Sequence, residues 1–150
     1  MDPTGRDPSS GRRCCQALGG LAPLTVLAGD PAAGMRLADE MVTAAGTLPT
    51  RQSLAMALTR AAQTALLADD LGRAADHLSE LFLLLDAMGT DRWRGDALEI
   101  AAVHRQRCGD SDRAAELFAE CDRLRAARRE RGGASRLLAD QVREARRTPA

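Results

Sequence analysis

Residues 89–132 read GTDRWRGDALEIAAVHRQRCGDSDRAAELFAECDRLRAARRERG, and this stretch decides the fold. It holds two segments of helical length on either side of Asp110. An aspartate at such a turn is typical of a helix N-cap, because its carboxylate accepts hydrogen bonds from free backbone N–H groups. Gly132 then closes the second segment, as glycine commonly does just past a helix end. The stretch therefore predicts two helices joined by a tight turn.

The same pattern recurs upstream at an offset of 40 residues. Acidic, small and apolar residues fall into matching columns, which are Asp30, Asp70 and Asp110; Glu40, Glu80 and Glu120; Gly34, Ala74 and Ala114; Leu18, Leu58 and Leu98; and Ala22, Ala62 and Ala102. Internal repeats of this length are typical of stacked helical hairpins. The second helices of the earlier units end at Gly46 and Gly89.

The repeat predicts an all-α fold, built as a short right-handed solenoid of three helix–turn–helix units with a C-terminal capping helix. We expect helices near 15–28, 31–45, 51–68, 71–88, 91–108, 111–131 and 135–147. The last has Leu137, Leu138 and Val142 on one side, as an end cap requires. Residues 14–147 form the predicted repeat domain, and residues 1–13, rich in Pro, Gly and Ser, form a predicted disordered tail.

The composition agrees with a helical protein and argues against several classes of binding site. Tyr is absent and β-branched residues are scarce, which argues against a sheet. All 21 basic residues are Arg, but the net charge is zero, so no overall field recruits nucleic acid. The four Cys lack metal-ligand spacing, and no apolar run has the length of a membrane span. We therefore expect a cytoplasmic protein without a metal, a cofactor or membrane contact.

Residues 12–29 have two interpretations, which the sequence leaves open. Arg12 and Arg13 precede a weakly apolar stretch, an arrangement that twin-arginine export signals share. The same residues also fit the repeat as its first helix. Gly19, Gly20 and Pro23 disfavour a helix interior, so this helix is expected to start late, with Pro23 in its first turn, or to be broken.

The third unit resembles a tetratricopeptide repeat in its turn and second helix. The resemblance lies in Gly109-Asp110, Arg113-Ala114-Ala115 and Leu117-Phe118. It implies that Ala114 is the small residue at a helix crossing, that Phe118 is an aromatic plug, and that Cys121 is a second small position. Two departures are clear, since Leu98 and Arg105 replace the aromatic residues of the first helix and the period is 40 instead of about 34.

The longer, Ala/Leu/Arg-rich form resembles the C-terminal repeat regions of large actinobacterial transcriptional regulators, over residues 15–132. Such regulators carry a nucleotide-binding domain and a DNA-binding domain elsewhere. This sequence has no GxxxxGK[ST] phosphate loop and no convincing helix-turn-helix. The resemblance therefore implies a detached sensor or docking module, or a fragment of a larger regulator.

The candidate binding site is a groove lined by the first helices of the units, which form the concave face in tetratricopeptide stacks. The matching positions point away from the core stripe of Leu54, Leu58, Ala61 and Ala65. They are Met56, Thr59, Gln63 and Leu67 in the second unit, and Asp96, Glu99, Val103 and Arg107 in the third. An ordinary exposed face would show the same spacing.

A basic patch near the C-terminus is the alternative site, for nucleic acid or an acidic partner. Its residues are Arg123, Arg125, Arg128 and Arg129. Positive charge also suits a solvated helix end, and no aromatic residue is interleaved to stack on bases.

The remaining alternative, a small enzyme, rests on two histidines. His77 occupies the column of Leu37 and Leu117, so we expect it to be packed, and His104 is expected to be structural or exposed. Neither completes a Ser/His/Asp or Cys/His set, so no catalytic residue is proposed. The acids near the turns are expected to cap helices. We therefore predict a non-catalytic protein–protein interaction scaffold with a regulatory role, and a nucleic-acid-associated regulator as the alternative.

Overall fold

The structure is a computed structural model that describes residues 8–128 and 138–147. The described part is all-α. Its seven helices are α1 (Pro8–Leu27), α2 (Pro31–Gly46), α3 (Arg51–Leu67), α4 (Leu71–Met88), α5 (Arg94–Arg107), α6 (Ser111–Arg128) and α7 (Ala139–Arg147).

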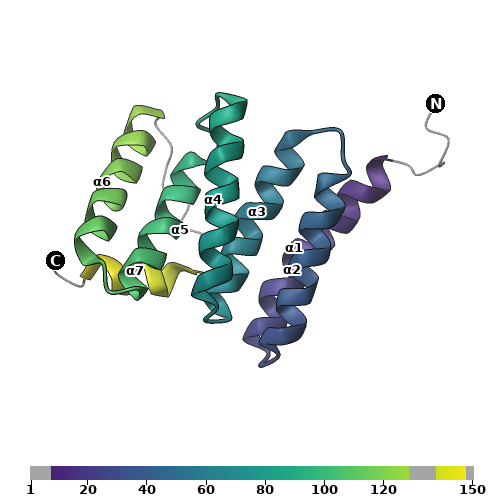
Figure 1. Ribbon diagram of the computed structural model, residues 1–150, viewed down its shortest axis with the longest axis horizontal. Coiled ribbons are helices and arrows are strands. Elements are labelled where there is room, and N and C mark those ends of the chain that lie inside the picture. Colours follow the sequence, from purple (N-terminus) through teal and green to yellow (C-terminus); the bar gives the residue numbers. More distant parts are fainter. Residues whose placement is uncertain (1–7, 129–137, 148–150) are drawn as a thin grey trace.

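Adjacent helices pack in pairs, α1 with α2, α3 with α4 and α5 with α6, and the pairs follow one another along the molecule (Figure 1). Contacts between pairs run from α2 to α3 and from α4 to α5. The first helices of the pairs also touch in succession, since α3 contacts both α1 and α5. The predicted all-α class and the pairwise packing of neighbouring helices are confirmed, and the arrangement is consistent with a small helical repeat.

The three turns inside the pairs are built alike, 40 residues apart. Gly29, Asp69 and Gly109 each have a positive φ, of 101°, 61° and 84°. At each turn the following aspartate donates its backbone N–H to the carbonyl five residues back, and the positive-φ residue donates to the carbonyl three residues back. This is the hydrogen-bond pattern of a Schellman motif, which satisfies the free carbonyls at a helix end.

The aspartate column caps the second helices, as the sequence predicts. An Oδ1 atom of Asp30 accepts from the backbone N–H of Ala33 at 2.9 Å, and Asp70 accepts from that of Arg73 at 3.0 Å. Asp110 accepts from the N–H of Arg113 at 3.2 Å. A carboxylate at this position also interacts favourably with the helix dipole.

The matched columns form the core. Ala22, Ala62 and Ala102 have no exposed surface, and the same holds for Met41, Leu81 and Cys121. The small-residue column is buried as well, and Gly34 of α2 lies close against Ala22 and Val26 of α1. The spacing of 40 residues is therefore a packing repeat as well as a sequence repeat.

Helix α1 differs from its expected form, because it begins at Pro8 rather than near residue 15 and continues through a buried Pro23. The first six residues of α1 belong to the predicted tail, and residues 1–7 lie outside the described part. Pro8 suits a first helical position, and Gly11 lies against Leu48 of the α2–α3 connection. Burial of Cys15, Ala22 and Val26 against α2 explains how a helix forms despite its glycines and proline.

Helix α7 is held to the third pair by an apolar stripe and an arginine. Val142 and Ala145 are buried, and so is Leu138 just before the helix. Arg146 donates two hydrogen bonds to Asp122 of α6, at 3.0 and 2.9 Å, and its guanidinium lies 4.4 Å from the ring centre of Phe118. The part of the predicted capping helix from residue 135 to 137 lies outside the described residues.

Within residues 8–128 and 138–147, none of the helices has both the length and the apolar character needed to cross a membrane.

Candidate functional site

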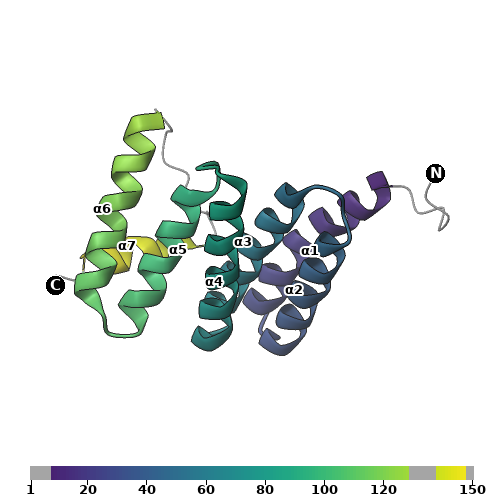
Figure 2. The same ribbon diagram turned by 45° about the horizontal axis from the view of Figure 1, so that its top comes forward.

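A recess lies where the C-terminal ends of α3 and α5 meet α7, and we call it the α7 recess. Its volume is about 520 Å³. Its lining residues are Leu66, Leu67, Val103, Gln106, Arg107, Asp140, Gln141, Glu144 and Ala145. Figures 1 and 2 show α7 running crosswise to α5 and α6. A helix that crosses its neighbours contacts them over a short length, which leaves space beside the contact.

The floor of the α7 recess is apolar. Leu66 and Val103 are almost fully buried beneath it, and Leu67 is half-buried. Ala145 of α7, whose side chain is too small to fill the space, completes the floor. A concave surface with an apolar floor and a few polar groups at its rim is the usual form of a binding site.

Arg107 forms one polar wall of the recess and is already engaged. Its Nη1 donates to the carbonyl of Leu66 at 2.6 Å, and its Nη2 pairs with the carboxylate of Asp69. Arg107 thereby adds a hydrogen bond to a carbonyl that also accepts from the N–H of Asp69, and it joins the end of α5 to the α3–α4 turn. The guanidinium is thus fixed in place rather than swinging over the recess.

The opposite wall comes from α7 and bears acceptor groups. Asp140 and Glu144 lie four residues apart on the helix and line the recess together with Gln141. Asp140 also pairs with Arg143, which is more than half exposed. The Oε1 atom of Gln141 is buried and has no hydrogen-bond partner among the described residues. Such an atom is rare in folded proteins and costs free energy until a donor reaches it.

The predicted groove is only partly reproduced. Leu67, Val103 and Arg107 are brought together in the α7 recess. Thr59 and Gln63 are buried in the middle of α3, where Thr59 donates to the carbonyl of Ala55 at 2.8 Å and Gln63 accepts from Arg60 at 3.2 Å. Because α1 and α5 both pack against α3, its central turns do not form an open face.

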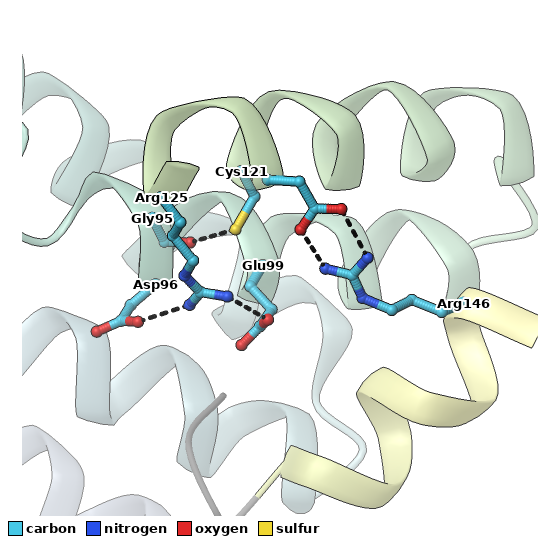
Figure 3. A network of polar contacts seen from close by, with 7 residues as sticks. Gly95, Asp96, Glu99, Cys121, Arg125 and Arg146 are labelled. Atoms are coloured by element: carbon cyan, nitrogen blue, oxygen red, sulfur yellow. Dashed lines mark hydrogen bonds and ion pairs between the residues drawn. The ribbon is translucent and has the colours of Figure 1, made fainter. Parts of the chain in front are cut away.

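The rest of the predicted groove lies elsewhere. Met56 is half-buried on α3 and does not line the recess. Asp96 and Glu99, expected at the groove, instead bind Arg125, which was expected in the basic patch (Figure 3). Val103 is buried beneath the recess floor. Four of the eight groove residues, Thr59, Gln63, Glu99 and Val103, are therefore buried rather than exposed.

The contacts of Arg125 form a buried polar network between α5 and α6 (Figure 3). Its Nη1 donates to Glu99 Oε2 at 2.7 Å and its Nη2 to Asp96 Oδ1 at 3.0 Å. Only 10% of the Arg125 side chain and 6% of the Glu99 side chain are exposed. Burial is the strongest single effect and acts to lower the pKa of Arg125, but the hydrogen bonds to Glu99 and Asp96 and the negative charge of Glu99 together raise the pKa above its ordinary value, so the guanidinium stays charged.

The basic patch is consequently divided by the structure. Arg125 points between the helices and is neutralised there, whereas Arg123 and Arg128 are exposed on α6. Arg129 lies outside the described residues. A surface that binds the phosphates of nucleic acid needs several exposed cations on one face, and Arg125 does not contribute to such a face.

His104, Cys15 and Cys121 are buried, whereas Cys14 and Cys108 are exposed. His104 is buried, with Nε2 2.9 Å from the carbonyl oxygen of Leu71. Cys121 donates its thiol to the carbonyl of Gly95 at 3.3 Å, and burial raises its pKa to about 11, so it remains protonated at neutral pH. All four cysteines are free, and the described residues contain no group of three His, Cys, Asp or Glu side chains that could hold a metal ion.

His77 is half-buried on α4, and its Nε2 has no hydrogen-bond partner among the described residues. Burial, with the nearby charge of Arg73, lowers its pKa below the ordinary value of 6.5. The unfolded chain therefore binds a proton more readily than the folded one, so folding stability falls as the pH drops through about 6.5 and is unaffected above it.

His77→Leu should remove this part of the pH dependence, because leucine occupies the matching positions 37 and 117. We expect urea denaturation at pH 7.5 and pH 5 to show a smaller loss of stability in the variant than in the parent. Every other ionisable residue is the same in both proteins and provides a common background. An equal loss in the two would show that His77 is protonated as easily in the folded protein as in the unfolded one.

Sequence reasoning missed the contribution of α7 to the site. The segment is amphipathic, with Asp140 and Glu144 on one face and apolar residues on the other, which are Leu138, Val142 and Ala145. This pattern could have indicated that the two acids face a recess beside the helix. The direction in which α7 crosses its neighbours has no comparable sequence signal.

Comparison with known proteins gives no relative for this chain. No family model matches it, and searches of curated proteins and of solved structures find no significant match. The function of this chain is therefore inferred from its own geometry.

Proposed function

We propose that the chain is a non-catalytic docking module that binds a peptide segment of another protein in the α7 recess. The proposal includes a short right-handed solenoid of tetratricopeptide-type units, with α7 as its terminal cap. The three alike turns and the succession of first helices support that architecture. The resemblance to regulator repeat regions favours a regulatory role for the docking.

The observation that carries the proposal is the recess itself. Three helices from different parts of the chain contribute to it, and its volume of about 520 Å³ is in the range of small binding sites. Leu67, Val103 and Arg107 belong to the face on which tetratricopeptide stacks are expected to bind partners. The apolar floor offers hydrophobic burial, and the polar walls offer orientation.

Binding is better supported than catalysis by the surroundings of the recess. His104 uses its Nε2 on a backbone carbonyl, and His77 lies on α4, away from the recess lining. The lining offers carboxylates, amides and one fixed guanidinium rather than an activated nucleophile. The nucleic-acid alternative is weakened because Arg125 is neutralised inside the fold.

The test is a combinatorial peptide library displayed on phage and panned against the whole chain. We expect selected peptides to bind the parent, and Leu67→Glu to weaken that binding about five- to thirtyfold, as loss of one good contact of about 1–2 kcal/mol does. Leu83→Glu is the matched control, because Leu83 is exposed on α4 and does not line the recess. Thermal melts of both variants check that the fold is kept.

Two outcomes would replace the proposal. A panning that selects no peptide would argue against peptide docking. Capture of a mixed-sequence DNA duplex that depends steeply on salt and is lost in Arg123→Ala and Arg128→Ala would establish the basic alternative instead.

A further inference from the structure

The α7 wall of the recess combines negative charge with an unsatisfied acceptor. Asp140 and Glu144 lie one helical turn apart, and Gln141 lies between them in sequence. The buried Oε1 of Gln141 accepts no hydrogen bond from any described residue. A group that donates hydrogen bonds and carries positive charge would be favoured by all three side chains.

The arginine of the recess lining is engaged at the opposite wall. Arg107 is held at the other wall by the carbonyl of Leu66 and by Asp69. Arg143, which pairs with Asp140, does not line the recess, and the Asp140 side chain in that pair is 91% exposed. An ion pair so exposed contributes little free energy, so an incoming cation can replace it at small cost.

The floor adds a second requirement, because it is apolar. Leu67, the floor residue that is only half-buried, would be desolvated by an aliphatic chain and not by a compact ion. Long basic side chains combine both properties, since their methylene stems pack on apolar surface while the charged head reaches a polar group.

We infer that the α7 recess binds the side chain of a Lys or Arg residue in the docked segment, with its stem on the floor and its charged head at Asp140, Gln141 and Glu144. This inference rests on the proposed function and names the chemistry of its partner: a segment in which a basic residue stands beside an apolar one. The apolar neighbour would lie against Leu67 at the open side of the floor.

The sequences of the library-selected peptides test the inference directly. We expect Lys or Arg to be enriched at one position next to an aliphatic or aromatic residue. For a selected peptide, norleucine in place of Lys, or citrulline in place of Arg, should weaken binding about tenfold, because the charge is removed while the stem is kept.

Protein variants locate the basic residue in the recess. Glu144→Gln and Gln141→Leu should each weaken peptide binding about three- to tenfold, while Glu120→Gln, which removes an exposed acid of α6 outside the recess lining, should leave it unchanged. Melting curves of all three check the fold. Binding of the norleucine or citrulline peptide should lose its sensitivity to Glu144→Gln, as a direct contact requires.

The outcomes separate this inference from the proposed function. Peptides that bind and respond to Leu67→Glu but show no basic residue would overturn the inference and leave docking intact. Basic peptides insensitive to Glu144→Gln, Gln141→Leu and Leu67→Glu would bind elsewhere, and both statements about the recess would fall. A library that yields no peptide would remove the proposed function, and the inference with it.

Discussion

Arg125→Leu is expected to lower the free energy of unfolding by about 3–5 kcal/mol, because it leaves the Glu99 carboxylate buried without its partner. Asp96 cannot compensate, since it is also an acid. Domains of this kind have total stabilities of about 5–15 kcal/mol, so the variant should be close to unfolding at 37 °C. Urea denaturation followed by circular dichroism at 222 nm would measure the loss.

The repeat supplies the matched control. Positions 59 and 85 of the second pair correspond to positions 99 and 125, and they hold Thr59 and Leu85, which are both buried. The double variant Glu99→Thr with Arg125→Leu places the same uncharged pair of residues, Thr and Leu, at the matching positions of the third pair. We expect it to recover most of the stability lost in Arg125→Leu, because a buried ion pair replaced as a whole is often neutral or stabilising.

A double-mutant cycle with Glu99→Thr, Arg125→Leu and the double variant isolates the coupling between the two side chains. Additive losses would contradict the structure, because they would mean that Glu99 and Arg125 do not meet. A large coupling would establish that the pair is formed in solution.

The repeat was readable from sequence because its determinants are local. The aspartate caps and the glycines that follow helices act within a few residues, so Asp30, Asp70 and Asp110 reveal them directly. The pairing of neighbouring helices followed from those short turns. These features depend on chain chemistry within one turn and hardly on the rest of the fold.

The candidate site was less readable because burial depends on how helices approach one another. A periodic pattern separates one helix face from the other, but α3 is enclosed by neighbours on several sides, so Thr59 and Gln63 are buried with their own hydrogen bonds. Glu99 and Arg125 carried a usable signal. Each stands in a column that is uncharged in the earlier units, and their charges are opposite.

The extent of the first helix also depends on packing that the local sequence does not reveal. Gly19, Gly20 and Pro23 predict a weak helix on local grounds, yet α1 runs from Pro8 to Leu27. Propensity is a small term for each residue, and packing against a neighbouring helix overrides it. This close packing leaves no room for a Cβ at position 34, so the first pair has glycine there where the later units have alanine.

Gly34→Ala is therefore expected to destabilise the protein by about 1–3 kcal/mol, although alanine is the better helix former by about 1 kcal/mol. A Cβ added at Gly34 would lie 2.3 Å from Val26 Cγ2 and 2.7 Å from the carbonyl oxygen of Ala22. The valine methyl could rotate away, but the carbonyl belongs to the backbone of α1 and moves only with that helix. The overlap should outweigh the gain in propensity.

Gly20→Ala makes the same change on α1 at an exposed position, where an added Cβ meets nothing within 4 Å. There the propensity gain acts alone, so this variant should be more stable than the parent by about 0.5–1 kcal/mol. The two substitutions should thus shift the melting temperature in opposite directions. If Gly34→Ala also raised the melting temperature, the first pair would have to pack as loosely as the pairs that carry Ala74 and Ala114, and the close approach of α2 to α1 would be refuted.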